Sequence, residues 1–253
     1  MSDLSATEDV YWAVANALET HGHRQSGRRI LEVGSGLGYF TYALAHRGYN
    51  IRAIDISETA VEAARLQFGD LFTRADLADY ALAHPDSIDA VIACEVIEHL
   101  VDPVAFVKMA FALVKPGGHL ILTTPNRSFF GSDVLWETDL PPVHYWWYSE
   151  RSIEALMRQV GGRVEFVDFT PYQKRVPLYM PADPPIDVPT RLPILDQCGS
   201  VLRPSSVLSR AKRRVGALLP ALKSHPVTQR LLGRHRIEGP RRTVMCAIVQ
   251  RHE

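Results

Sequence analysis

The sequence predicts an α/β fold, in which a doubly wound, mainly parallel sheet carries helices on both faces. Three observations support this fold class. Short apolar stretches with β-branched residues alternate along the chain with stretches of helical periodicity. A glycine-rich turn joins the first of these strands to the helix that follows it. The stretch from Ile88 to Ala93 is apolar except for Asp89, as expected of a strand that is buried on both faces of a sheet.

The first strand and its turn have the sequence Ile30-Leu-Glu-Val-Gly-Ser-Gly-Leu-Gly-Tyr-Phe-Thr41. Gly34, Gly36 and Gly38 leave backbone N–H groups at the start of a helix open to a ligand. The dinucleotide fingerprint has its third glycine where this chain has Tyr39, and a P-loop would end in Gly-Lys-Ser/Thr, which this turn lacks. The turn therefore predicts a pocket for a nucleotide-type ligand, although its sequence matches neither the dinucleotide fingerprint nor the P-loop.

Helices are expected where a capping signal precedes an amphipathic stretch and a glycine follows it. Ser5-Ala-Thr-Glu8 is a capping box, and Asp102-Pro103 places a proline at the first helical position. Gly48 and Gly161 are expected just beyond the ends of two helices. The predicted helices cover residues 5–20, 39–47, 57–68, 103–114 and 150–160.

The other strands are expected from short apolar stretches that end at polar or turn residues. They cover residues 51–54, 71–75, 88–93, 120–124, 164–169 and 242–250, which together with 30–33 gives seven strands. Strands five and six should run parallel to strand one, so that they end at the same sheet edge as the glycine turn. Open α/β sheets bind their ligands at this edge.

Length and composition are those of an ordinary globular protein. The 253 residues suffice for one large domain, and 46% of them are apolar while 22% are charged. We predict a single domain over 1–253, in which the segments 127–148 and 171–240 are insertions that form a lid or a substrate-binding subdomain. Three widely separated cysteines favour a reducing, cytoplasmic location. We expect neither a signal peptide nor a membrane span.

Two carboxylates follow predicted strands near the glycine turn. Asp55 ends the second strand about twenty residues beyond the turn, where a doubly wound sheet places an acidic side chain beside ribose hydroxyls. Alternatively, Asp55 or Ser57 only caps the next helix. Asp76 follows the third strand, where a simple helix cap would have the same appearance.

The stretch after strand four carries residues suited to proton transfer or metal binding. It has the sequence Cys94-Glu-Val-Ile-Glu-His-Leu100, and Glu95, Glu98 and His99 would share one face if it were helical. His144 lies in the first insertion and is followed by four aromatic residues that could stack on an acceptor or pack in the core.

These motifs resemble those of class I S-adenosylmethionine (SAM) methyltransferases. The first motif is Glu-x-Gly-x-Gly-x-Gly, with Glu32 near the end of the strand. Glu-x-x-Glu-His with a later histidine resembles the ubiquinone-biosynthesis type of O-methyltransferase and the small-RNA 2′-O-methyltransferases, which bind a divalent metal. The resemblance covers about Leu4 to Thr170 and the last strand, and it implies a sheet whose last strand is antiparallel. It also implies that SAM is held by Glu32, Gly34, Ser35, Gly36, Gly38, Asp55, Ile56, Asp76, Leu77 and Glu95.

The reaction expected from this resemblance is O-methylation of a small molecule. The Asn/Asp-Pro-Pro-Tyr motif of base N-methyltransferases and a Pro-Cys nucleophile are both missing. His99 or His144 could deprotonate the acceptor, with Glu98 beside them, because an imidazole titrates near neutral pH. Alternatively, Glu95, Glu98, His99 and His144 bind a divalent metal such as Mg²⁺, which acidifies the acceptor hydroxyl. In a third reading these residues only shape the pocket.

The second insertion ends in a basic segment, residues 203–242, which contains eleven lysines and arginines against Glu238 alone. Such a segment fits an anionic or phosphate-bearing acceptor, RNA or an anionic membrane surface, or it is a solvated face balanced by the rest of the chain. The rival functions are therefore RNA 2′-O-methylation, methylation of a lipid or quinol acceptor at a membrane, and non-catalytic SAM binding. The sequence leaves the oligomeric state open.

Overall fold

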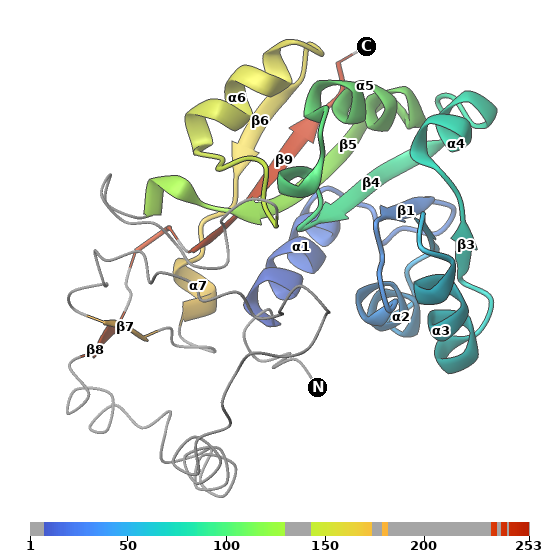
Figure 1. Cartoon of the computed structure of the whole chain (residues 1–253), viewed down its shortest axis with the longest axis horizontal. Helices are drawn as coiled ribbons and strands as arrows, with labels where there is room; N and C mark the ends of the chain where they lie inside the picture. Colours follow the sequence, from blue (N-terminus) through green and yellow to red (C-terminus); the bar gives the residue numbers. More distant parts are fainter. Residues whose placement is uncertain are drawn as a thin grey trace, which may run out of the picture. The chain divides into compact units, whose positions relative to one another are not determined.

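The computed structural model describes residues 8–129, 143–173, 179–181, 234–236, 239–241 and 243–252 (Figure 1). The chain divides into two units, and the first comprises Met1–Gly131, Thr138–Val176 and Glu238–Glu253. The second comprises Ser132–Glu137 and Pro177–Ile237, where the short strands β7 (Tyr179–Pro181) and β8 (Arg234–Arg236) pair antiparallel. Most of the two predicted insertions, and most of the basic segment, lie outside the described residues. Their role as a lid stays a prediction.

The first unit is built on a seven-stranded sheet with the strand order β3-β2-β1-β4-β5-β9-β6. The last strand, β9, pairs antiparallel with both of its neighbours, and the other pairings in the sheet are parallel. The predicted fold class and the antiparallel last strand are thus confirmed. The strands are β1 (Ile30–Val33), β2 (Ile51–Asp55), β3 (Phe72–Arg74), β4 (Ile88–Cys94), β5 (Val114–Pro125), β6 (Arg163–Phe166) and β9 (Val244–Gln250).

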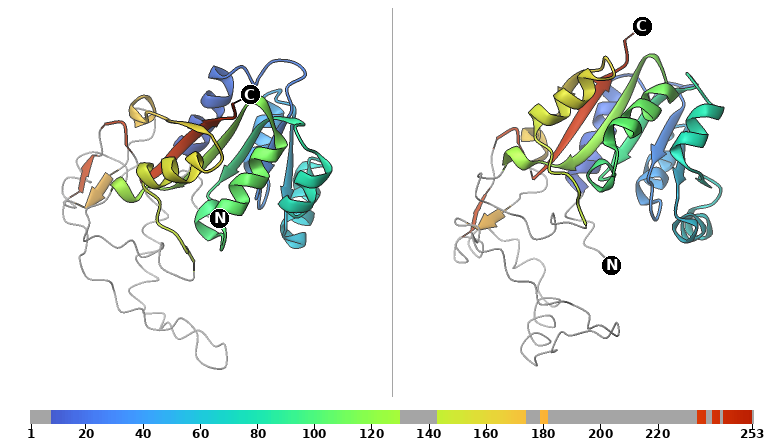
Figure 2. Two further views of the ribbon diagram at one scale, coloured as in Figure 1. Left: turned by 90° about the horizontal axis from the view of Figure 1, so that it is seen from above. Right: turned by 45° about the horizontal axis from the view of Figure 1, so that its top comes forward.

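Helices cover both faces of this sheet, as Figures 1 and 2 show. Apolar contacts place α1 (Glu8–Thr20), α2 (Tyr39–His46), α3 (Glu58–Phe68) and α7 (Thr170–Gln173) on one face. They place α4 (Leu77–Ala83), α5 (Pro103–Leu113) and α6 (Glu150–Arg158) on the other. Among the described residues, no helix combines the length and the apolarity that crossing a bilayer requires.

Local signals explain most helix boundaries. Ser57, Asp102 and Ser149 are N-caps whose side chains accept backbone N–H bonds, and Ser149 also forms a capping box. The predicted capping box at Ser5 lies outside the described residues. The sequence did not predict α4 and α7, because each spans only one or two turns and carries little helical periodicity.

Strand β5 begins earlier than predicted, because the segment after α5 continues directly into the sheet at Val114. A buried carboxylate on β4 holds the start of β5 by a hydrogen bond. Asp89 is 3% exposed, and its oxygens accept bonds from Lys115 Nζ at 2.7 Å, Arg28 Nη1 at 2.8 Å and the Arg29 N–H at 2.9 Å. Burial alone would raise the pKa of Asp89, but these donors outweigh it and lower the pKa to about 2. The one charged residue of β4 therefore anchors the starts of β1 and β5.

Histidines pack together near the start of β5. His23 Nε2 and His119 Nδ1 are 3.0 Å apart, both residues are buried, and the His21 ring centroid lies 4.4 Å from that of His119. Burial, then the neighbouring histidines and Arg28, lower the pKa of His23 and of His119 from 6.5 to about 4, while Asp89 acts in the opposite direction on His23. Both side chains therefore stay neutral in the folded protein at pH values at which the unfolded chain protonates them.

This pairing predicts acid sensitivity of the fold. As pH falls from 6.5 toward 4, the unfolded chain binds protons that the folded protein does not, so the free energy of unfolding should fall, by at most about 3 kcal/mol per histidine. Urea unfolding at about pH 7.5 and about pH 5 measures this change. His119→Gln should reduce the difference between the two pH values. Equal pH dependence in the variant and the wild type would contradict the account.

Candidate functional site

The turns that carry the predicted site residues meet at one edge of the sheet. β1 pairs in parallel with β2 and β4, and β4 pairs in parallel with β5, so all four strands end on the same side. The structure thus brings together the glycine turn, Asp55, the segment from Glu95 to Leu100 and the end of β5. These groups are separated by up to about ninety positions in the sequence.

The glycine turn adopts a conformation that requires glycine. Gly34, Gly36 and Gly38 have φ angles of +76°, +52° and +80°. A Cβ at Gly34 would lie 2.6 Å from Val96, and a Cβ at Gly38 would lie 2.5 Å from the Phe72 ring. At Gly36, in contrast, a Cβ would meet nothing within 4 Å. The outer glycines therefore allow close packing of the protein itself, whereas the middle one faces open space.

Polar groups beside this open space suit a nucleoside ligand. The Ser35 hydroxyl is buried and has no hydrogen-bond partner among the described residues. Asp55 accepts the Gly36 N–H at 2.8 Å and the Ser57 N–H at 2.8 Å, and each carboxylate oxygen retains a second acceptor position. The next side chain, Ile56, is 72% exposed, which suits apolar contact with a planar ring. An orphaned hydroxyl, an open glycine and a carboxylate at the strand end are consistent with a bound SAM molecule.

Glu32 is buried on β1, two residues before Gly34. It alternates along β1 with Leu31 and Val33, so it points toward the α1 and α2 layer, where it accepts a hydrogen bond from the Thr41 hydroxyl. The residue is 4% exposed, and burial is the main cause that raises its pKa to about 7, although the Thr41 bonds act against it. Glu32 therefore ties the turn to α2, and its contact with SAM stays a prediction. Thr41 carried no signal of this role in the sequence.

The two residues after β3 have clear structural roles. Asp76 is the N-cap of α4 and accepts the Ala78 N–H at 2.7 Å. Leu77 is 7% exposed and packs in the apolar core. The capping alternative for Asp76 is thus realised, and the binding of SAM by these two residues stays a prediction.

The segment after β4 is not the continuous helix that would have aligned its acidic residues. Glu95 has a φ of +54°, a rare conformation for a residue with a side chain, and only Ile97–His99 form a short 3₁₀ helix, η2. The Glu95 N–H donates a hydrogen bond to the Thr123 carbonyl at 3.0 Å, and this bond fixes the turn after β4 to β5. The expectation that Glu95 shares a face with Glu98 and His99 is therefore wrong. Glu95 is not part of the cluster that those two residues form.

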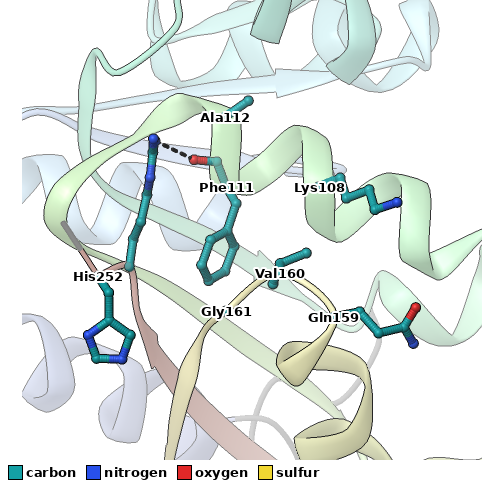
Figure 3. A pocket seen from close by; sticks show the side chains of 8 residues that line it. Lys108, Phe111, Ala112, Gln159, Val160, Gly161 and His252 are labelled. Atoms are coloured by element: carbon teal, nitrogen blue, oxygen red, sulfur yellow. Dashed lines mark hydrogen bonds between the residues drawn. The ribbon is translucent and has the colours of Figure 1, made fainter.

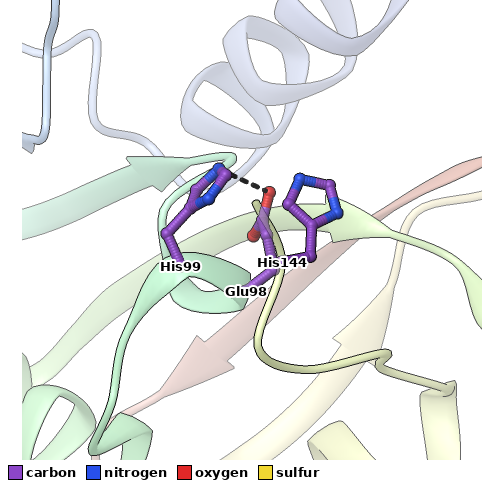
Figure 4. Close-up of side chains that lie close together, drawn as sticks. All are labelled: Glu98, His99 and His144. Carbon is purple, nitrogen blue, oxygen red and sulfur yellow. Dashed lines mark ion pairs between the residues drawn. The ribbon is translucent and has the colours of Figure 1, made fainter. Parts of the chain in front are cut away.

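Glu98, His99 and His144 do come together (Figure 4). One ligand atom from each lies within 4.8 Å of those of the other two, a spacing compatible with a single metal ion. The His99 and His144 ring centroids are 4.7 Å apart, and His99 Nε2 lies 3.8 Å from Glu98 Oε1. Glu98 is 1% exposed and accepts a hydrogen bond from Thr124 Oγ1 at 2.9 Å. Thr124 was not predicted as a site residue, and nothing in its sequence context distinguishes it.

Hydrogen bonds hold the His144 segment against η2. The Tyr145 N–H donates to the Glu98 carbonyl at 2.8 Å, and the Trp146 indole N–H donates to the Leu100 carbonyl at 2.7 Å. His99 Nδ1 lies 2.6 Å from the Val143 carbonyl. Because a carbonyl oxygen can only accept, Nδ1 carries the proton of the neutral His99 ring, and the lone pair is on Nε2. His99 is therefore prepared to accept a proton or to bind a metal through Nε2.

Described residues of the first unit line two cavities that could hold a ligand. One of about 310 Å³ lies at the carboxyl ends of β5 and β6, and Asn126, two residues beyond Thr124, contributes to its lining. The other, of about 440 Å³, lies at the opposite sheet edge, where Lys108, Gln159 and His252 contribute to its lining (Figure 3). Of these two cavities, which are lined by described residues, the first lies at the same sheet edge as the candidate site.

Comparison with known proteins identifies the family. A family model described as "Methyltransferase domain" matches residues 12–165, more than half of the chain. The chain is 38% identical over 108 residues to the ubiquinone biosynthesis O-methyltransferase of Thiobacillus denitrificans, a match that covers 41% of this chain and 47% of that protein. The enzyme of the same description from Xanthomonas campestris pv. campestris is 38% identical over 107 residues, or 40% and 45% of the two chains. The chain thus spans about half the length of the curated relatives it matches.

Solved structures share the fold at low sequence identity. A SAM-dependent methyltransferase from Archaeoglobus fulgidus matches with a TM-score of 0.53 and 16% identity, over 95% of this chain and 94% of that one. Phosphoethanolamine N-methyltransferase 2 of Haemonchus contortus, in complex with SAM, matches with a TM-score of 0.58 and 17% identity, over 96% and 52% of the two chains. The family match, the strand order and the glycine turn agree. The chain therefore belongs to the methyltransferase domain family, within the class I SAM-dependent methyltransferases.

Proposed function

We propose that this protein transfers the methyl group of SAM to a hydroxyl oxygen of a small molecule. The observation that carries this proposal is the Glu98, His99 and His144 cluster at the ligand-binding edge of the sheet, in which His99 Nε2 holds a lone pair. SAM supplies an electrophilic methyl group on its sulfonium. The description of the curated relatives as O-methyltransferases supports oxygen as the acceptor atom.

The chain's own residues would supply alignment and proton removal. The acceptor hydroxyl is a poor nucleophile while it keeps its proton, so His99 Nε2 takes this proton as the oxygen attacks the methyl group. Glu98, whose Oε1 lies 3.8 Å from Nε2, stabilises the resulting imidazolium, and the Val143 carbonyl keeps the ring oriented through Nδ1. The largest contribution to the rate would come from holding the acceptor oxygen in line with the methyl–sulfur bond of SAM.

A divalent cation bound by Glu98, His99 and His144 is the second candidate mechanism, since this cluster has compatible spacing. The ion would acidify the hydroxyl in place of a histidine base. RNA, membrane and anionic acceptors remain proposals as well, because they depend on the basic segment 203–242, most of which lies outside the described residues. A steep loss of RNA binding with increasing salt would favour the RNA acceptor.

The test is a radiolabelled methyl-transfer assay with SAM and a panel of acceptors: catechol, phenol, glycerol, ethylamine and a short RNA. We expect product with a hydroxyl acceptor and none with the amine, and we expect the rate to survive treatment with EDTA. Loss of activity in EDTA with recovery in Mg²⁺ or Mn²⁺ would establish the metal mechanism instead. Transfer to the amine alone would overturn the assignment of oxygen as the acceptor atom.

A further inference from the structure

One buried hydroxyl at the candidate site has no partner in the protein. Tyr148 is 5% exposed, and its hydroxyl makes no hydrogen bond among the described residues. Other buried tyrosines differ, since the Tyr172 hydroxyl accepts from Asn16 Nδ2 at 2.9 Å and the Tyr49 hydroxyl lies 3.4 Å from the Ala15 carbonyl. An unpaired buried hydroxyl lowers stability, so its presence calls for an explanation.

The structure fixes Tyr148 in place. Its carbonyl accepts the Arg127 N–H at 2.7 Å, and the next residue, Ser149, begins α6 with a capping box. The ring belongs to the same apolar cluster as Ile97 of η2 and Ile153 of α6. The backbone and the ring of Tyr148 are therefore held between η2 and the start of α6.

Tyr148 also belongs to the segment that forms the candidate site. It lies four residues after His144, and the Tyr145 N–H between them bonds to the Glu98 carbonyl. Burial, and then the charge of Glu98, raise the pKa of the Tyr148 hydroxyl. The group therefore remains protonated at neutral pH and is available as a hydrogen-bond donor.

We infer that the Tyr148 hydroxyl donates a hydrogen bond to an oxygen atom of the bound acceptor, beside the Glu98, His99 and His144 cluster shown in Figure 4. This inference rests on the proposed function. The oxygen that attacks the methyl group becomes more negative as His99 removes its proton, and a fixed donor stabilises such charge. The negative Glu98 carboxylate would repel the negative charge that develops on the acceptor oxygen. A neutral hydrogen-bond donor near Glu98 would offset this repulsion.

Tyr148→Phe tests the inference, and Tyr172→Phe is the matched control, because both remove one hydroxyl from a buried ring. Thermal unfolding, SAM binding by calorimetry and the rate of methyl transfer to catechol, or to the hydroxyl acceptor that the wild type uses best, are measured for each. We expect Tyr148→Phe to keep or raise the wild-type Tm, to bind SAM equally well and to lose about 100-fold in kcat/KM. Tyr172→Phe should lower the Tm by about 2–6 °C and keep its rate.

The inference is overturned if Tyr148→Phe loses as much Tm as the control, because the hydroxyl then has a partner in the protein. An unchanged kcat/KM would also overturn it. If the wild type methylates no hydroxyl acceptor, the proposed function fails. In that case the Tm values of Tyr148→Phe and Tyr172→Phe still decide whether the Tyr148 hydroxyl lacks a partner in the protein and is free to bind a ligand.

Discussion

Replacing His99 with alanine is expected to lower kcat for methyl transfer by about 10²–10⁴-fold while the Kd for SAM stays within about twofold. The variant removes an imidazole whose Nδ1 is held by the Val143 carbonyl and whose Nε2 lies 3.8 Å from the Glu98 carboxylate. The glycine turn and Asp55 are untouched, so cofactor binding should persist. Steady-state kinetics at saturating SAM, together with calorimetry, separates the two effects.

The chain provides a matched control for this variant. His84 is also exposed, and its Nδ1 also lies beside a backbone carbonyl, that of Tyr80, at 3.0 Å, but it stands at the end of α4. His84→Ala should therefore change stability about as much as His99→Ala and leave kcat unchanged. Added imidazole should restore part of the rate in His99→Ala. Equal rates in the two variants, or a loss confined to SAM affinity, would remove His99 from the chemistry.

Gly38→Ala is expected to lower the free energy of unfolding by roughly 2–5 kcal/mol. Gly38 has a φ of +80°, and its new Cβ would lie 2.5 Å from the ring of Phe72, a core residue that is 1% exposed. The backbone strain accounts for about 1–2 kcal/mol, and the forced repacking of the ring accounts for about 1–3 kcal/mol more. Urea unfolding measures the sum.

Gly48→Ala separates these two contributions. Gly48 has a φ of +87°, yet a Cβ there would meet nothing within 4 Å. This variant should therefore show only the strain, so that it unfolds at a higher urea concentration than Gly38→Ala. If both variants lost the same stability, the close packing of the glycine turn against β3 would contribute nothing.

The fold was predictable because the local sequence signals for helices, strands and turns are all consistent with the observed α/β sheet. The glycine turn, the cap at Asp102 and the apolar β4 each specify an element without reference to the rest of the chain. Asp89 is an exception to the apolar pattern of β4, and its burial is explained by its ion pairs with Arg28 and Lys115. These partners lie far apart in the sequence, and no sequence pattern indicates that they pair with one another.

The candidate site was predictable only in part, for the same reason. Glu98, His99 and His144 could be chosen by residue type, but their convergence depends on hydrogen bonds from the His144 segment to η2. Glu95 was misplaced because its positive φ cannot be inferred from a sequence that would also suit a helix. Thr124 acts through one hydrogen bond to Glu98, and a threonine near the end of a strand is otherwise unremarkable in the sequence.

If the glycine turn is a cradle for SAM, a side chain at Gly36 should weaken SAM binding, and this can be measured by calorimetric titration of SAM into the wild type, Gly36→Ala and Gly48→Ala. Both variants place a side chain at a positive φ in open space, but only Gly36 adjoins Ser35 and Asp55. We predict that the wild type and Gly48→Ala bind SAM with similar Kd and that Gly36→Ala binds at least about tenfold more weakly. No SAM binding by the folded wild type, or equal affinity in all three proteins, would contradict the account.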